Sequence, residues 1–213
     1  MKRIMILLAI LPALAYAQEP IRRHEIGINV GVSYNPANHE YKKFWRGYVA
    51  KYDLRDRNAG TLDDDQDYTT FNIDYLYNIN DRVAIGALAG YGNTREDKCR
   101  ILFSDEPLLR YGFAAMKSEI IYAMPSVRLS WFRSDNRRLN MYSRMSLGAM
   151  RQKNWVSHTS APELPTDKEY KWGIAGQITA FGIEGGGQLV KAYSEFGYGM
   201  HGIANIGIKF YFK

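Results

Sequence analysis

The sequence has 213 residues, of which 46% are hydrophobic and 23% charged, with a formal net charge of +6. This length suits one domain or two small ones, and a 14% aromatic content excludes a long disordered chain. Cys99 is the only cysteine, which excludes a disulfide scaffold. The mean hydropathy of −0.36 argues against a bundle of membrane-spanning helices.

The first seventeen residues have the pattern of a secretory signal peptide. Lys2 and Arg3 precede an apolar run over 4–11, and an Ala-Tyr-Ala ending closes the segment at Ala17. The run is shorter than the roughly 20 residues that a spanning helix needs. We therefore predict cleavage after Ala17, which leaves 18–213 as one exported domain. Export and the modest charge of that domain argue against a nucleic-acid partner.

Alternation of apolar with small or polar residues, the period of a β-strand, recurs eight times in 18–213. The eight segments are 25–34, 70–78, 83–92, 118–132, 138–150, 171–184, 193–199 and 205–212. No stretch has a sustained helical period, although 41–52 or 107–117 could hold a turn or two.

The connections between these segments alternate between long and short. The long ones cover 35–66, 94–117 and 151–170. An even number of antiparallel strands with alternating turns and loops is typical of outer-membrane barrels. We predict an all-β fold, an eight-stranded antiparallel up-and-down transmembrane β-barrel in a Gram-negative outer membrane. Both termini would then face the periplasm and the long loops the outside.

Aromatic residues on the apolar face distinguish this barrel from a soluble one, whose faces are inverted. They fall into two groups, one beside the long loops and one near the short turns or the C-terminus. The first group is Tyr34, Tyr91, Trp172 and Tyr198; the second is Tyr75, Tyr77, Trp131, Phe210 and Phe212. Two aromatic girdles separated by an aliphatic band match the two interfaces of a bilayer.

The opposite face carries charges from five strands. These are Asp74, Arg128, Arg144, Glu195 and Lys209. They could form an ion path or a polar ligand site, or a packed network of salt bridges. Since eight strands leave an interior just wide enough for side chains, the network is the favoured interpretation.

The closing segment resembles the final hairpin of small outer-membrane barrels. The residues that carry the resemblance are 192–199, Gly202-Ile203 and 207–212, together with 124–128 followed by Trp131. The family is the Bacteroidetes-type single-domain barrel, broadly similar to the outer-membrane X, opacity and outer-membrane A types. The resemblance implies that Phe210 and Phe212 form the signal read by the barrel-assembly machinery, although Lys213 follows them.

A few other residues invite a chemical role. His158 and Ser160 with Glu163 faintly resemble the H-x-S arrangement of outer-membrane lipid A deacylases, but they fall in the predicted loop 151–170. Asp63, Asp64 and Asp65 fit a solvated loop tip, and His24, His39 and His201 have no metal-ligand spacing. We expect no metal, no cofactor and no enzymatic activity.

Basic and aromatic residues gather in the predicted outer loops, where they could contact lipopolysaccharide phosphates or a surface partner, or serve as interfacial anchors. They are Tyr41, Lys42, Lys43, Phe44, Trp45, Arg46, Lys51, Arg55, Arg57, Arg151, Lys153 and Trp155. The sequence thus predicts a monomer with a structural or surface-interaction role, such as adhesion to a host or partner protein. A lipid A-modifying hydrolase and a narrow channel or transport component are the alternatives.

Overall fold

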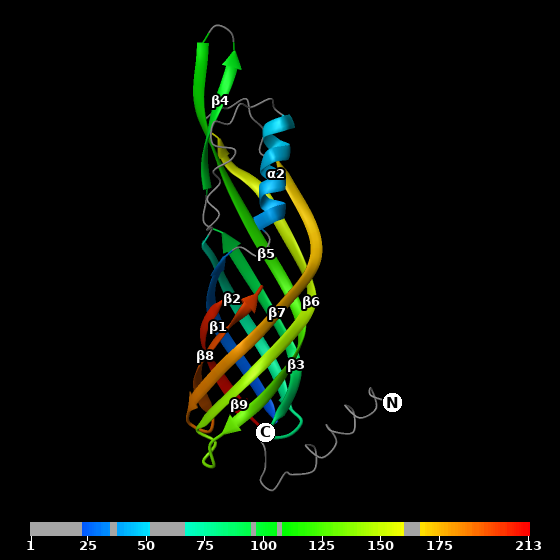
Figure 1. Ribbon diagram of the computed structural model, residues 1–213, viewed down its shortest axis with the longest axis vertical. Helices are drawn as coiled ribbons and strands as arrows, with labels where there is room; N and C mark the ends of the chain where they lie inside the picture. Colours follow the sequence, from blue (N-terminus) through cyan, green and yellow to red (C-terminus); the bar gives the residue numbers. More distant parts are fainter. Residues whose placement is uncertain (1–22, 35–37, 52–66, 95–96, 106–107, 160–166) are drawn as a thin grey trace, which may run out of the picture.

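The computed structural model describes residues 23–34, 38–51, 67–94, 97–105, 108–159 and 167–213 (Figure 1). The predicted signal peptide, 1–17, lies outside the described residues. The described elements are β1 (His24–Tyr34), α2 (Asn38–Lys51), β2 (Asp67–Asn78), β3 (Val83–Thr94), β4 (Asp97–Asp105), β5 (Leu108–Arg133), β6 (Leu139–Thr159), β7 (Lys168–Gly186), β8 (Val190–Gly199) and β9 (Ala204–Phe212).

Eight of these strands close into a barrel in which every pair is antiparallel. Each strand pairs with its neighbour in the chain, except that β3 pairs with β5 and skips β4. The ring closes where β9 pairs with β1, from His24 opposite Phe212 to Val32 opposite Ala204. This pairing confirms the predicted eight-stranded antiparallel up-and-down barrel.

Three barrel strands and β4 continue as a sheet beyond one end of the barrel, here called the rim (Figure 1). β4 pairs only with the first part of β5, and β6 pairs with β5 on one side and with β7 on the other, where the register reaches Trp155 opposite Lys168. The prediction of loops over 94–117 and 151–170 is therefore wrong for 97–105, 108–117, 151–159 and 168–170, as is a helical turn at 107–117.

For β6, the physical reason for this error is its composition. Along β6, buried Gln152 and Asn154 alternate with Arg151 and Lys153, so both faces are polar and the hydrophobic alternation disappears. Backbone pairing continues without that signal, because hydrogen bonds to β5 and β7 satisfy the strand on both sides.

The predicted loop 35–66 contains α2, which is far longer than the turn or two expected at 41–52. Tyr41, Trp45 and Tyr48 are buried and spaced four and three residues apart, so they share one helical face. Ion pairs join Glu40 to Lys171 and, at the other end of the helix, Lys51 to Asp167. The helix therefore runs antiparallel to the start of β7. No helix among the described residues has the length and apolar character to cross a membrane.

Glycines on the inner face make room for large rings in the lumen. A Cβ atom at Gly90 would lie 2.4 Å from the Tyr122 ring, and one at Gly182 would lie 2.5 Å from the Tyr142 ring. At Gly86 the obstacle is the wall itself, because a Cβ there would lie 1.9 Å from the backbone oxygen of Tyr75.

We expect Gly86→Ala to lower the free energy of unfolding by about 1–3 kcal/mol, because β2 and β3 must separate to admit the methyl group. Gly176→Ala is the matched control: its Cβ would face outward, with only Leu147 Cδ1 nearby at 3.8 Å. The control should change stability by no more than about 0.5 kcal/mol. Urea unfolding followed by tryptophan fluorescence compares the two, and equal losses would contradict the close approach at Gly86.

The attachment of α2 should depend on pH through Glu40. The Lys171 ammonium donates a hydrogen bond to this carboxylate and holds its pKa below the ordinary 4.5. The stabilisation of α2 by this ion pair is therefore complete above pH 4.5, and it is lost as the pH falls through the lowered pKa of Glu40. Protection of α2 amides against hydrogen exchange, corrected for intrinsic rates, should then fall by no more than about fivefold. In Glu40→Gln, the α2 amides should have the lower protection at every pH and should show no fall as the pH is lowered. An identical fall in the variant would contradict the assignment of the pH dependence to Glu40.

Candidate functional site

The lumen holds all five charged residues that the sequence placed on the polar face. Asp74, Arg128, Arg144, Glu195 and Lys209 come from β2, β5, β6, β8 and β9, and each is at most 1% exposed. The structure brings them together as two adjoining clusters, completed by side chains that the sequence did not single out.

The first cluster is centred on Arg144. Its Nη2 donates to Glu195 Oε2 at 2.6 Å, and its Nη1 lies 3.5 Å from Asp74 Oδ1. Nη2 also lies 3.0 Å from His201 Nδ1, whose Nε2 is 2.8 Å from Asn29 Oδ1. Because a guanidinium can only donate, His201 accepts at Nδ1 and donates from Nε2 to Asn29, which describes a neutral imidazole.

The second cluster lies nearer the short turns, and its carboxylates and cations alternate. Glu25 accepts from Arg128 at 2.5 Å and lies 3.1 Å from Lys209 Nζ. Glu184 accepts from Lys209 at 3.0 Å and from Lys191 at 3.1 Å, and lies 3.6 Å from Arg128. Each of these two carboxylates therefore contacts at least two cations, which compensates for the loss of bulk water.

Tyrosine hydroxyls join the clusters. Tyr142 donates to Glu195 at 2.7 Å and accepts from Lys209 at 3.0 Å, which connects one cluster to the other. Tyr193 donates to Asp74 at 3.2 Å and accepts from Asn29 at 2.6 Å. The joined network, here called the lumen network, holds four carboxylates and four cations among the described residues: Glu25, Asp74, Glu184 and Glu195 with Arg128, Arg144, Lys191 and Lys209.

This arrangement pairs opposite charges and places tyrosine rings against the cations. The rings of Tyr142 and Tyr193 lie 4.3 and 4.4 Å from the Lys209 ammonium, and Tyr142 also lies 5.1 Å from the Arg128 guanidinium. Cations held between carboxylates and ring faces are fixed in place. The lumen network thus joins side chains of β1, β2, β5, β6, β7, β8 and β9 across the interior of the barrel.

Sequence reasoning missed Glu184 because β7 contains a bulge. The pairing of β7 with β6 and β8 shifts between Thr179 and Phe181, so the inner positions change from 177 and 179 to 182 and 184. An extra residue inverts every later side chain of a strand. The break in alternation at Phe181 and Ile183 was the available signal for this inversion.

Glu25, Tyr142 and Tyr193 already lay on the polar face of their predicted strands and could have been included. His201 had no such signal, because it belongs to the turn between β8 and β9. Its ring is 0% exposed, and its backbone N–H donates to Gln177 at 2.9 Å. The fold of this turn, and not a strand period, places the imidazole in the lumen.

The predicted girdle residues whose side chains the structure describes lie on the outer wall. Trp172, Tyr198 and Tyr91 point outward near the rim, with 76%, 75% and 39% of their surface exposed. Toward the short turns, the outward residues are Tyr75, Tyr77, Trp131, Phe210 and Phe212, of which Tyr77 is half-buried. The side chain of Tyr34 lies outside the described part.

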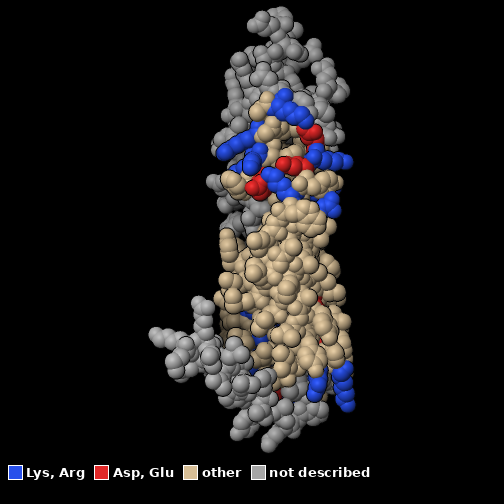
Figure 2. All heavy atoms as spheres, turned by 90° about the vertical axis from the view of Figure 1, so that its right-hand side faces the viewer, with Lys and Arg blue, Asp and Glu red and all other residues tan. Residues whose placement is uncertain are grey.

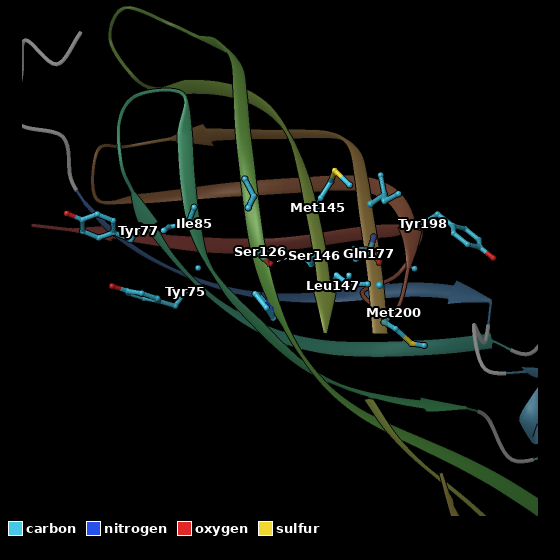
Figure 3. Close-up of a pocket in the computed structure, with 16 residues that line it drawn as sticks. Tyr75, Tyr77, Ile85, Ser126, Met145, Ser146, Leu147, Gln177, Tyr198 and Met200 are labelled. Atoms are coloured by element: carbon cyan, nitrogen blue, oxygen red, sulfur yellow. Dashed lines mark hydrogen bonds between the residues drawn. The ribbon is translucent and has the colours of Figure 1, made fainter. Parts of the chain in front are cut away.

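A shallow apolar depression of about 1370 Å³ crosses this outer wall. Figure 3 shows Tyr75 and Tyr77 at one end of it and Tyr198 at the other, with Met145 and Leu147 between them. Its chemistry suits hydrocarbon chains better than a polar substrate, since most residues that line it are apolar or aromatic and only Ser126, Ser146 and Gln177 are polar.

The remaining candidates do not form a site within the described residues. His158 belongs to β6, with its Cα opposite that of Ala115, and its predicted partners Ser160 and Glu163 lie outside the described part. Asp63, Asp64 and Asp65 lie outside it as well. Cys99 belongs to β4, opposite Ala114.

The histidines also stand apart from one another. His24 Nδ1 lies 2.7 Å from the Tyr75 hydroxyl and its ring stacks on Phe212, while His39 is exposed on α2. No group of three His, Cys, Asp or Glu side chains that could hold a metal ion occurs in the part of the chain that the structure describes.

The chain matches no protein-family model and no curated protein sequence. Its fold is similar to the N-terminal β-barrel domain of OprF from Pseudomonas aeruginosa, with 12% identity and a TM-score of 0.41 over 91% of this chain and 100% of that one. The attachment invasion locus protein Ail of Yersinia pestis gives 15% identity and a TM-score of 0.38, over 89% and 98% of the two chains. The structure of Ail in complex with the heparin analogue sucrose octasulfate gives 16% identity and a TM-score of 0.39, over 89% of this chain and 98% of that one. The barrel assignment rests on the strand pairing above.

Arg144→Ala should lower the free energy of unfolding by about 3–5 kcal/mol, because Asp74 and Glu195 would remain buried without their cation. Arg133→Ala is the control: it removes an arginine that lies 2.9 Å from Asp81 at the half-exposed turn end, and should cost no more than about 1 kcal/mol. Adding Glu195→Gln to Arg144→Ala should recover part of the loss. Urea midpoints measure all three; a control as damaging as Arg144→Ala would refute a stabilising lumen network.

Proposed function

We propose that this protein is an integral outer-membrane β-barrel without an open pore, with a structural or surface-interaction role. The observation that carries the proposal is that charged side chains lie inside the barrel and apolar ones outside it, the reverse of a soluble protein. Charged groups such as Arg128, Arg144 and Lys209 are buried in the lumen, whereas Leu147, Ile174 and Ile206 are 67%, 77% and 68% exposed on the wall. An outer wall of this kind is stable only against an apolar medium.

The dimensions of the wall support membrane insertion. On β5 the outward side chains from Ile121 to Trp131 are uncharged, a stretch of eleven residues that ends before Arg133. A tilted strand of about 9–11 residues crosses the hydrocarbon layer. Figure 2 shows the same limit, with an uncharged wall over the barrel and charged side chains gathered beyond the rim.

The lumen network supports a closed barrel. The described part of the lumen contains paired charges and tyrosine rings, and an eight-stranded barrel has little space beyond its side chains. A plugged barrel contributes to the envelope through its wall and its surface, so a transport role is not the function we propose, nor is catalysis.

The extended sheet of β4 to β7 and helix α2 supports a surface role. These elements stand beyond the apolar wall and carry most of the charged side chains in Figure 2. In the proposed orientation they face the cell exterior, where adhesion or contact with a host or partner protein would occur. Export with cleavage after Ala17, and recognition of Phe210 and Phe212 by the assembly machinery, belong to the same proposal.

The proposal predicts that the protein stays in the membrane fraction after carbonate extraction and migrates differently before and after boiling, as folded barrels do. Purified protein in planar bilayers should give no steady single-channel current, because the lumen network blocks the interior. Recovery in the aqueous fraction would overturn the membrane assignment. A reproducible unit conductance would instead favour the channel alternative.

A further inference from the structure

The outer face of the extended sheet carries an ordered array of basic and aromatic side chains. Strand register places them in three rows across β5, β6 and β7. The rows are Lys117–Trp155–Lys168, Glu119–Lys153–Tyr170 and Ile121–Arg151–Trp172. We call these nine residues the rim patch.

Ring contacts hold the central cations of the rim patch in place. The guanidinium of Arg151 lies 4.5 Å from the Tyr170 ring centroid and 6.0 Å from that of Trp172. The ammonium of Lys153 lies 4.1 Å from the Trp155 ring. Such contacts orient a cation without neutralising it, so the charge of Arg151 stays available to an anion, while Lys153 also pairs with Glu119.

The rim patch has an excess of positive charge. Four cations, Lys117, Arg151, Lys153 and Lys168, face one carboxylate, Glu119, which lies 3.4 Å from Lys153. The alternating residues of these strands point to the other face, where Gln152 and Asn154 are buried and uncharged. The rim patch is therefore complementary in charge to an anion.

The lowest row is continuous with the apolar wall. Ile121 and Trp172 are 59% and 76% exposed beside Arg151, and the next outward residue of β7 is Ile174, 77% exposed. Arg151, the cation of the lowest row, therefore lies in the same row as exposed apolar side chains that continue into the wall. An anion bound here would lie at the headgroup level of the membrane in the proposed function.

We propose that the rim patch binds the phosphate of a lipid headgroup in the outer leaflet, with Arg151 and Lys153 as its principal cations. This inference rests on the proposed membrane location. Arginine and lysine both donate charge-assisted hydrogen bonds to phosphate oxygens. The neighbouring Trp155, Tyr170 and Trp172 lie at the interface, where rings with one polar edge are favoured.

A lipid is favoured over a soluble anion or an acidic protein because the patch and the wall form one surface. A soluble phosphate would gain nothing from Ile121 and Ile174, whereas a lipid places its acyl chains there and its phosphate beside Arg151. The basic residues of α2, among them Lys43 and Arg46, lack this connection to the wall and provide a matched comparison.

The test is native mass spectrometry of the full chain in an uncharged detergent, with dioleoylphosphatidic acid or dioleoylglycerol as the probe. These lipids share their acyl chains and differ by the phosphate. The wild type should retain phosphatidic acid in preference, and Arg151→Gln/Lys153→Gln should weaken that binding at least about tenfold. Lys43→Gln/Arg46→Gln removes the same charges from α2 and should bind as the wild type does.

Three results would overturn the proposal. They are equal binding of the two lipids, an equal loss in both double variants, or displacement of the lipid by millimolar inorganic phosphate, which would indicate a site for free anions. Carbonate resistance and boiling-dependent mobility are measured on the same proteins. A wild type that fails those two assays refutes the proposed function, whereas one that passes them and still shows no phosphate preference refutes only the rim patch.

Discussion

The interior of an eight-stranded barrel accommodates side chains and little else, and the arrangement of buried charges in this protein depends on that limit. Charges that enter such a space lose water and must find partners inside it. Arg144 therefore lies between Asp74 and Glu195, and Lys209 between Glu25 and Glu184. Since these pairs join strands across the lumen as well as around the wall, they also brace the ring.

The same limit determines the outer surface. Polar groups share the lumen with a buried apolar cluster that includes Leu88 and Ile120, and many other large aliphatic side chains lie exposed on the outer wall. Where the strands rise beyond the rim, the outward positions become Arg151, Lys153 and Trp155 while the backbone pairing continues. The chemistry of the outward side chains, and not the strand geometry, changes at that level.

Local patterns were sufficient for the barrel strands and insufficient beyond them. Period-two alternation at Ile26, Ile28 and Val30 depends only on a strand with one apolar face, so it appears in the sequence directly. The strand over 151–159 has no apolar face, and α2 depends on the packing of Tyr41, Trp45 and Tyr48, so both were predicted as loops. Glu184 was missed because one extra residue in β7 inverts its direction.

By itself the sequence determined the fold class and the inner positions of charges such as Asp74 and Arg144, because alternation is a property of each strand alone. Only the tertiary structure decided which charges meet. Arg144 and Glu195 are 51 residues apart in the chain, and Asp74 and Tyr193 are 119 apart. The distances between these side chains depend on closure of the barrel, on strand register and on the β7 bulge. The rim patch likewise arises from pairing between strands, since no single strand contains it.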